Sequence, residues 1–142
     1  MITNLLLGKR IFIIEDDIVN LYVYSKCLSK NGASIFQDVL GYGYAKGIVL
    51  HILECLPIDL IILDIMLRRG VNGYDVYDAI RANTSIQNIP VVAVTALDPE
   101  TEIPKAKAKG LNGYISKPVN SVEFYNQIKT VLDGEKIWII SR

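Results

Sequence analysis

Short apolar runs alternate with helix-like segments along this chain, and this alternation limits its fold more than any other feature. The apolar runs lie at about residues 9–14, 33–37, 58–63, 90–94 and 112–116. Segments with apolar residues at helical spacing follow them, at about residues 17–30, 42–55, 74–82, 99–109 and 120–132. Strands that alternate with helices predict βαβ units and therefore a parallel sheet.

Strict alternation also predicts how the elements are arranged. Right-handed crossovers place helices on both faces of a parallel sheet. We therefore predict an α/β fold of the flavodoxin-like type, a three-layer sandwich with five helices and a five-stranded parallel sheet in the order 2-1-3-4-5. The run at 58–63 is apolar almost throughout, as is typical of a strand buried on both faces. In this order the first and third strands are neighbours at the topological switch point, where such sheets bind ligands.

Polar residues stand at the ends of four of these strands. Glu15 and Asp16 follow the first strand, Asp64 follows the third, Thr95 the fourth and Lys117 the fifth. Because the carboxyl ends of parallel strands meet at one edge, we expect these side chains to converge on one crevice. Carboxylates that lie close together need a cation to neutralise them. The sequence therefore predicts a chemical site at this edge.

The residue types at this edge suit phosphoryl chemistry. Carboxylates are the ligands of hard divalent ions, and Mg²⁺ takes few of them while it keeps several waters. A carboxylate can act as a nucleophile and form an aspartyl phosphate, a role we predict for Asp64. The Lys117 ammonium and the Thr95 hydroxyl can hold the other phosphoryl oxygens.

Composition narrows the class of protein. The 142 residues are enough for one domain, and 15 basic residues balance 15 acidic ones. A zero net charge gives no basic excess for nucleic acid or an anionic membrane, so we expect neither as a partner. No run of about 18 apolar residues predicts a membrane span. Cys27 and Cys55 lie in different predicted helices and form no disulfide framework, so we expect a cytoplasmic protein.

Taken together and in this order, these residues resemble the receiver domain (CheY-like) of two-component response regulators. The similarity covers about residues 8–133 and leaves a C-terminal tail at 134–142. The resemblance implies that Glu15 and Asp16 are the acidic pair, Asp64 the phosphoacceptor, Thr95 the switch hydroxyl and Lys117 the family's lysine.

The same resemblance assigns roles to neighbouring residues. Tyr114 stands three residues before Lys117, where the family has an aromatic whose rotamer reports phosphorylation. Met66 takes the position whose backbone carbonyl completes the Mg²⁺ site of Glu15, Asp16 and Asp64. The peptide between Lys117 and Pro118 is expected to be cis.

The implied function is a phosphorylation-driven switch. A histidine kinase or histidine phosphotransfer protein would phosphorylate Asp64 with Mg²⁺, Thr95 would be drawn in, and Tyr114 would turn inward. The face formed by the fourth helix, the fifth strand and the fifth helix would then change its affinity for a downstream protein target. The same face could join two copies in a homodimer. Such a chain is a signalling phosphoacceptor rather than an enzyme, with only self-catalysed phosphorylation and dephosphorylation.

The sequence departs from the family after the phosphoacceptor. The loop reads Met66-Leu67-Arg68 where the family usually has Met-Pro, and Gly73 stands nine residues beyond Asp64 instead of eight, so we interpret one residue as inserted and the Pro as replaced by Arg. We hypothesise that Arg68 or Arg69 reaches the phosphate or the acidic surface of a partner.

Two other functions compete with this interpretation. A metal-dependent phosphatase with an aspartyl nucleophile would carry a second acid two residues after it, where this chain has Met66. A degenerate receiver could act as a phosphorylation-independent interaction module, although the complete acidic, Thr and Lys set argues against it. Asp17 is interpreted as a cap of the first helix. The apolar tail could pack on the core, pair with another chain or begin a linker.

Overall fold

A computed structural model describes residues 4–38, 44–67 and 70–141 of the chain. The strands are β1 (Arg10–Ile14), β2 (Ser34–Asp38), β3 (Leu60–Leu63), β4 (Val91–Thr95), β5 (Gly113–Ser116) and β6 (Ile137–Ile139). The helices are α1 (Ile18–Lys30), α2 (Ala45–Glu54), α3 (Gly73–Ala82), α4 (Pro99–Lys109) and α5 (Phe124–Leu132). The first two residues of the predicted helix at 42–55 lie outside the described residues.

The sheet is parallel throughout, with the order β2-β1-β3-β4-β5-β6. The predicted α/β class, the five helices and the order of the first five strands are confirmed. The predicted number of strands was wrong, because the described part of the chain contains a sixth strand within the predicted tail. A lone strand of three residues has no sequence signal of its own. Pairing with the otherwise open edge of β5 supplies the partner it needs.

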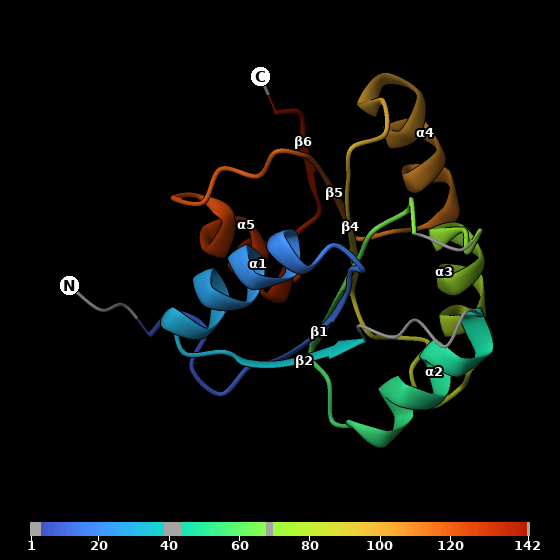
Figure 1. Ribbon diagram of the computed structural model, residues 1–142, viewed down its shortest axis with the longest axis horizontal. Helices are drawn as coiled ribbons and strands as arrows, with labels where there is room; N and C mark the ends of the chain where they lie inside the picture. Colours follow the sequence, from blue (N-terminus) through green and yellow to red (C-terminus); the bar gives the residue numbers. More distant parts are fainter. Residues whose placement is uncertain (1–3, 39–43, 68–69, 142) are drawn as a thin grey trace.

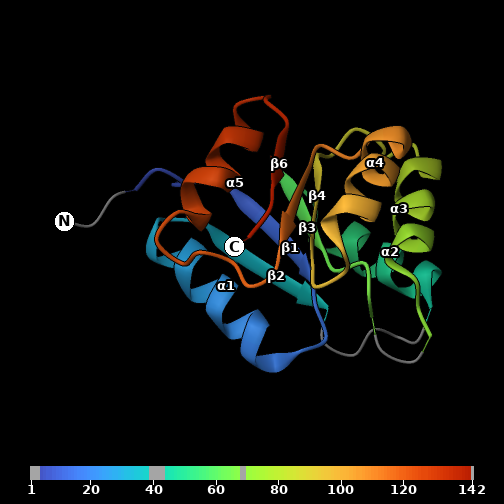
Figure 2. The same cartoon turned by 90° about the horizontal axis from the view of Figure 1, so that it is seen from above.

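Helices cover both faces of the sheet, as the crossover rule requires. Figures 1 and 2 show α1 and α5 on one face and α2, α3 and α4 on the other. Successive residues of the central strands point to opposite layers. In β1, Ile11 and Ile13 are buried on the α1–α5 side, and Phe12 and Ile14 are buried on the other. β3 divides its four buried residues in the same way, so its apolar run reflects burial on both faces.

Capping residues set the helix ends closest to the polar edge. The Asp17 carboxylate accepts hydrogen bonds from the N–H groups of Val19 at 2.9 Å and Asn20 at 3.1 Å, so the interpretation of Asp17 as a cap is confirmed. α4 begins at Pro99 and continues through Pro104 to Lys109.

The predicted start of the last helix at residue 120 was wrong, because α5 begins at Phe124. The Asn120 side chain instead accepts a hydrogen bond from the Val122 N–H within the preceding turn. No helix among the residues that the structure covers is long and apolar enough to cross a bilayer.

Candidate functional site

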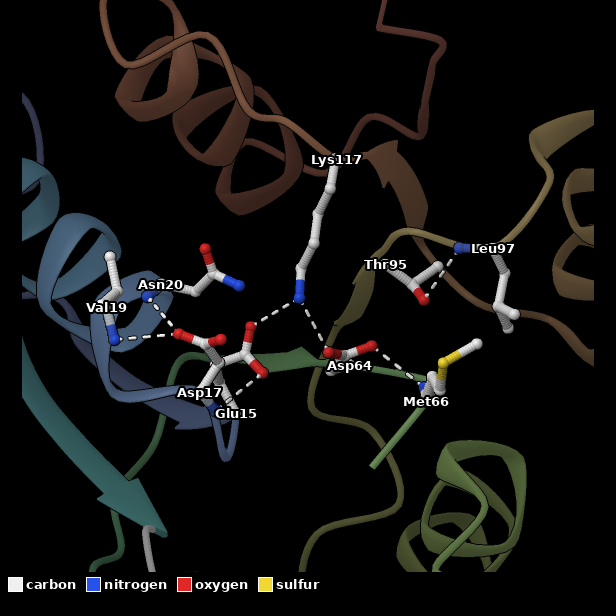
Figure 3. Close-up of polar contacts among 9 residues, drawn as sticks. All are labelled: Glu15, Asp17, Val19, Asn20, Asp64, Met66, Thr95, Leu97 and Lys117. Atoms are coloured by element: carbon white, nitrogen blue, oxygen red, sulfur yellow. Dashed lines mark hydrogen bonds and ion pairs between the residues drawn. The ribbon is translucent and has the colours of Figure 1, made fainter. Parts of the chain in front are cut away.

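Three charged side chains meet at the carboxyl edge of the sheet (Figure 3). Lys117 Nζ lies 2.7 Å from Glu15 Oε1 and 2.8 Å from Asp64 Oδ2. The two acids lie together because β1 and β3 are neighbours. Ile14 pairs with Leu63, and Glu15 and Asp64 directly follow these two residues. The structure therefore brings together three of the residues that the sequence predicted at this crevice.

The end of β5 carries the lysine to this position. The backbone N–H of Lys117 donates to the carbonyl of Thr95 at 2.8 Å, which continues the β4–β5 ladder by one residue. The peptide bond between Lys117 and Pro118 is cis, as the resemblance implied. The long side chain then runs back across the strand ends to the two carboxylates.

Burial controls the charge of this cluster. Only 1% of the Glu15 side chain is exposed, and the loss of water raises the pKa of its carboxyl to about 7. The hydrogen bond from Lys117 opposes this rise, and the nearby charge of Asp64 adds to it. Burial alone would lower the pKa of Lys117, but its hydrogen bonds to Asp64 and Glu15 outweigh burial and the pKa is raised. Lys117 therefore stays charged at neutral pH.

Thr95 ends β4, on the strand beside Asp64. Its side chain is fully buried, and its hydroxyl oxygen accepts a hydrogen bond from the Leu97 N–H at 3.4 Å. The second oxygen of Asp64, Oδ1, accepts from the Met66 N–H at 3.0 Å. Figure 3 shows Thr95 and Met66 on the side of Asp64 away from Glu15.

Tyr114 lies inside the protein in this structure. Its ring is completely buried, and its hydroxyl donates to the Leu97 carbonyl at 3.0 Å. Burial, aided by the charge of Glu102, raises the pKa of the Tyr114 hydroxyl to about 12. The inward position expected of the phosphorylated state is therefore already occupied.

An open cavity of about 390 Å³ gives solvent access to this cluster. It is lined by Glu15, Asp16, Asp17, Asn20, Asp64, Met66, Leu67, Ala96 and Lys117. Sequence reasoning gave no role to Ala96, although its position directly after Thr95 at a strand end could have indicated one. Asp64 is thus reachable from outside while most of its side chain remains buried.

The comparisons with known proteins agree with this geometry. Residues 11–129 match the family model described as the response regulator receiver domain. The chain belongs to this family. Receiver domains act as signalling phosphoacceptors in two-component systems.

Individual relatives match the receiver over nearly their full length. Protein PilH of Pseudomonas aeruginosa is 29% identical over 125 residues, which cover 88% of this chain and 98% of PilH. The polar-differentiation response regulator DivK of Brucella ovis is 28% identical over 130 residues, with 87% of this chain and 96% of DivK covered. The crystal structure of a response regulator from Desulfuromonas acetoxidans superposes with a TM-score of 0.75 at 25% identity, covering 88% of this chain and 97% of that one.

The acidic residues of this receiver are not arranged as a ready metal site. Among the residues described, no group of three or more His, Cys, Asp or Glu side chains is placed to hold a metal ion. Glu15 and Asp64 each direct an oxygen to Lys117 instead. The donor types nevertheless fit Mg²⁺, because Glu15, Asp16 and Asp64 all offer carboxylate oxygens and line the same cavity.

Backbone contacts join the two sides of the loop that follows Asp64 in this receiver. Met66 and Asn72 form an antiparallel bridge, and the Gly73 N–H donates to the Ile65 carbonyl at 2.8 Å. The predicted insertion relative to the family stays a prediction. Arg68 and Arg69 lie outside the described residues, so the hypothesis about their role stays a prediction.

Proposed function

We propose that this receiver accepts a phosphoryl group on Asp64 from a histidine kinase or a histidine phosphotransfer protein. The observation that carries the proposal is the position of Asp64, which lines an open cavity and is held by a charged lysine. An oxygen of the Asp64 carboxylate attacks phosphorus and forms an acyl phosphate. The phosphorus–nitrogen bond of the donor phosphohistidine breaks, and its electron pair returns to the imidazole, which is then free to take a proton.

Charge stabilisation is the contribution that this site can make to the transfer. Phosphoryl transfer depends mainly on positioning and on positive charge near the equatorial oxygens. Lys117 supplies one such charge beside Asp64, and the Thr95 hydroxyl supplies a hydrogen-bond donor on the next strand. Glu15, Asp16, Asp64 and the Met66 carbonyl would hold Mg²⁺, which supplies further positive charge when bound.

The switch that we propose uses the face formed by α4, β5 and α5. Tyr114 belongs to β5, and Lys117 directly follows it. Because Lys117 is hydrogen-bonded to Asp64, a change at Asp64 acts directly on the end of that strand. A downstream protein, or a second copy of the chain, would bind this face. The cytoplasmic location expected from the sequence remains a prediction.

Intact-mass measurement tests the transfer. Incubation with Mg²⁺ and acetyl phosphate, a small phosphodonor, is expected to add one phosphoryl group to the protein. EDTA should prevent the gain, and Asp64→Asn should abolish it, because an amide oxygen is a poor nucleophile. A folded Asp64→Asn variant that still gains one phosphoryl group would show that another residue is the acceptor.

A further inference from the structure

β6 closes the edge of the sheet that β5 would otherwise leave open. The two strands run parallel, with Gly113 opposite Ile137, Tyr114 opposite Trp138 and Ile115 opposite Ile139. Figure 2 shows β6 at this end of the sheet, between α5 and α4. The proposed partner face therefore has one of the chain's own strands lying on it.

Gly113 is shaped for this strand. A methyl group at residue 113 would lie 2.9 Å from Cγ1 of Ile137 and 3.2 Å from its carbonyl oxygen, closer than such contacts normally come. The backbone of Gly113 lies outside the left-handed region, so its conformation does not require glycine. The missing side chain serves instead to make room for Ile137.

The side chains of β6 contact both layers of the protein. Ile137 and Ile139 pack against the core beneath α1 and α5, and Trp138 packs against the core beneath α3 and α4. Lys107 of α4 places its ammonium 5.1 Å from the centre of the Trp138 ring, within the range of a cation–π contact. The edge of β5 is thus a fitted site for an extended segment with an aliphatic, aromatic, aliphatic pattern.

This strand is also connected to the phosphorylation site. The backbone N–H of Ser141 donates to the hydroxyl of Ser116, a buried residue that directly precedes Lys117. Trp138 is paired with Tyr114, whose hydroxyl binds the carbonyl of Leu97, two residues after Thr95. Residues that hold β6 are therefore adjacent to residues that would hold the phosphoryl group.

We propose that the β5 edge is a strand-binding site, occupied by residues 137–141 at rest and vacated when Asp64 is phosphorylated. This inference rests on the proposed function. A phosphoryl group on Asp64 redirects Lys117 from the carboxylate to the phosphoryl oxygens and so displaces the end of β5, where Ser116 anchors the tail. The uncovered edge then presents unpaired N–H and C=O groups to a partner that adds a parallel strand of the same side-chain pattern.

Trp138 is the single tryptophan of the chain, so its fluorescence reports on β6 alone. The full chain is treated with Mg²⁺ and acetyl phosphate, and one sample is used for intact mass, acrylamide quenching and hydrogen exchange. Trp138 is half-buried at rest, so we expect a measurable rise in quenching towards that of an exposed tryptophan, and faster exchange of the 137–139 amides, in phosphorylated protein. Asp64→Asn should show neither change.

The outcomes separate the two proposals. Phosphorylated protein with Trp138 as shielded as before would overturn the strand-release inference and leave the phosphoacceptor function intact. A folded protein that gains no phosphoryl group would overturn both.

A substitution far from the carboxylates provides a second test of the inference that does not require phosphorylation. Gly113→Ala is expected to push Ile137 away and raise the quenching of Trp138 without phosphorylation. Because coupling between two sites is reciprocal, this variant should also shift the extent of Asp64 phosphorylation at equilibrium. Val122→Ala, at a side chain that is 75% exposed, is the surface control and should change neither. A folded Gly113→Ala protein with Trp138 still shielded would contradict the fit between Gly113 and β6.

Discussion

Lys117→Met is expected to lower the free energy of unfolding by about 3 kcal/mol in metal-free buffer at pH 8, because it leaves two buried carboxylates without their cation. The side chains of Glu15, Asp64 and Lys117 are 1%, 6% and 15% exposed, so water from the adjoining cavity can replace the lost ammonium only in part. Urea unfolding followed by circular dichroism would measure the loss. Lys129→Met, at an exposed i,i+4 pair with Asp133, is the matched control and should cost far less.

The loss caused by Lys117→Met should depend on pH. The pKa of Glu15 is about 7 in the folded protein against 4.5 for an unperturbed carboxyl, so the folded state binds the proton more tightly. Its contribution to stability is therefore complete below pH 4.5 and is lost as the pH rises towards 7. Removing Lys117 raises this pKa further, so the variant should recover stability as the pH is lowered towards 4.5. Adding Glu15→Gln should also restore part of the loss at pH 8. Equal losses with and without Glu15→Gln would contradict the assignment of Glu15 as the uncompensated charge.

Gly73→Ala is expected to abolish phosphoryl uptake and to lower the free energy of unfolding by roughly 1–3 kcal/mol. A methyl group at residue 73 would lie 2.4 Å from the Ile65 Cα and 2.5 Å from the Asp64 carbonyl oxygen. Both atoms belong to the backbone, so neither can turn aside as a flexible side chain would. The start of α3 must therefore move away from the phosphoacceptor. Intact mass after acetyl phosphate treatment measures uptake, and urea unfolding measures stability.

Gly70→Ala is the control in the same loop. A methyl group there would meet no atom within 4 Å among the residues that the structure describes, although the backbone is left-handed with φ of +73°. We expect a loss of about 1 kcal/mol from that conformation and unchanged phosphoryl uptake. If Gly73→Ala took up phosphate as fast as the unmodified chain, the close approach of α3 to Asp64 would not be required for the reaction.

Patterns that repeat over many residues were readable from the sequence. The alternation of apolar runs with helical segments predicted the order of five strands, and that order predicted that Glu15 and Asp64 would be neighbours. Because β3 is buried on both faces, its residues are all apolar, and this apolar run could be recognised in the sequence. These features depend on the spacing of residue types along the chain, which the sequence displays directly.

Features that depend on a single contact were not readable in this way. β6 is three residues long, and it is a strand only because the edge of β5 lies beside it. α5 begins at Phe124, four residues later than predicted, because residues 121–123 form a turn in which the Asn120 side chain accepts from the Val122 N–H. The shared hydrogen bonds of Lys117 required the path of a long side chain across three strand ends. Each of these features depends on tertiary contacts, which the spacing of residue types along the sequence does not predict.

The fit of Ile137 against Gly113 gives a criterion for recognising related chains from sequence. Any residue larger than glycine at that position would fill the space that Ile137 occupies. Receivers with an alanine or a larger residue at the start of the fifth strand should therefore leave that edge bare or cover it in another way. Those with glycine there and a short apolar run some twenty residues later are candidates for a sheet of the same width, which their solved structures can check one by one.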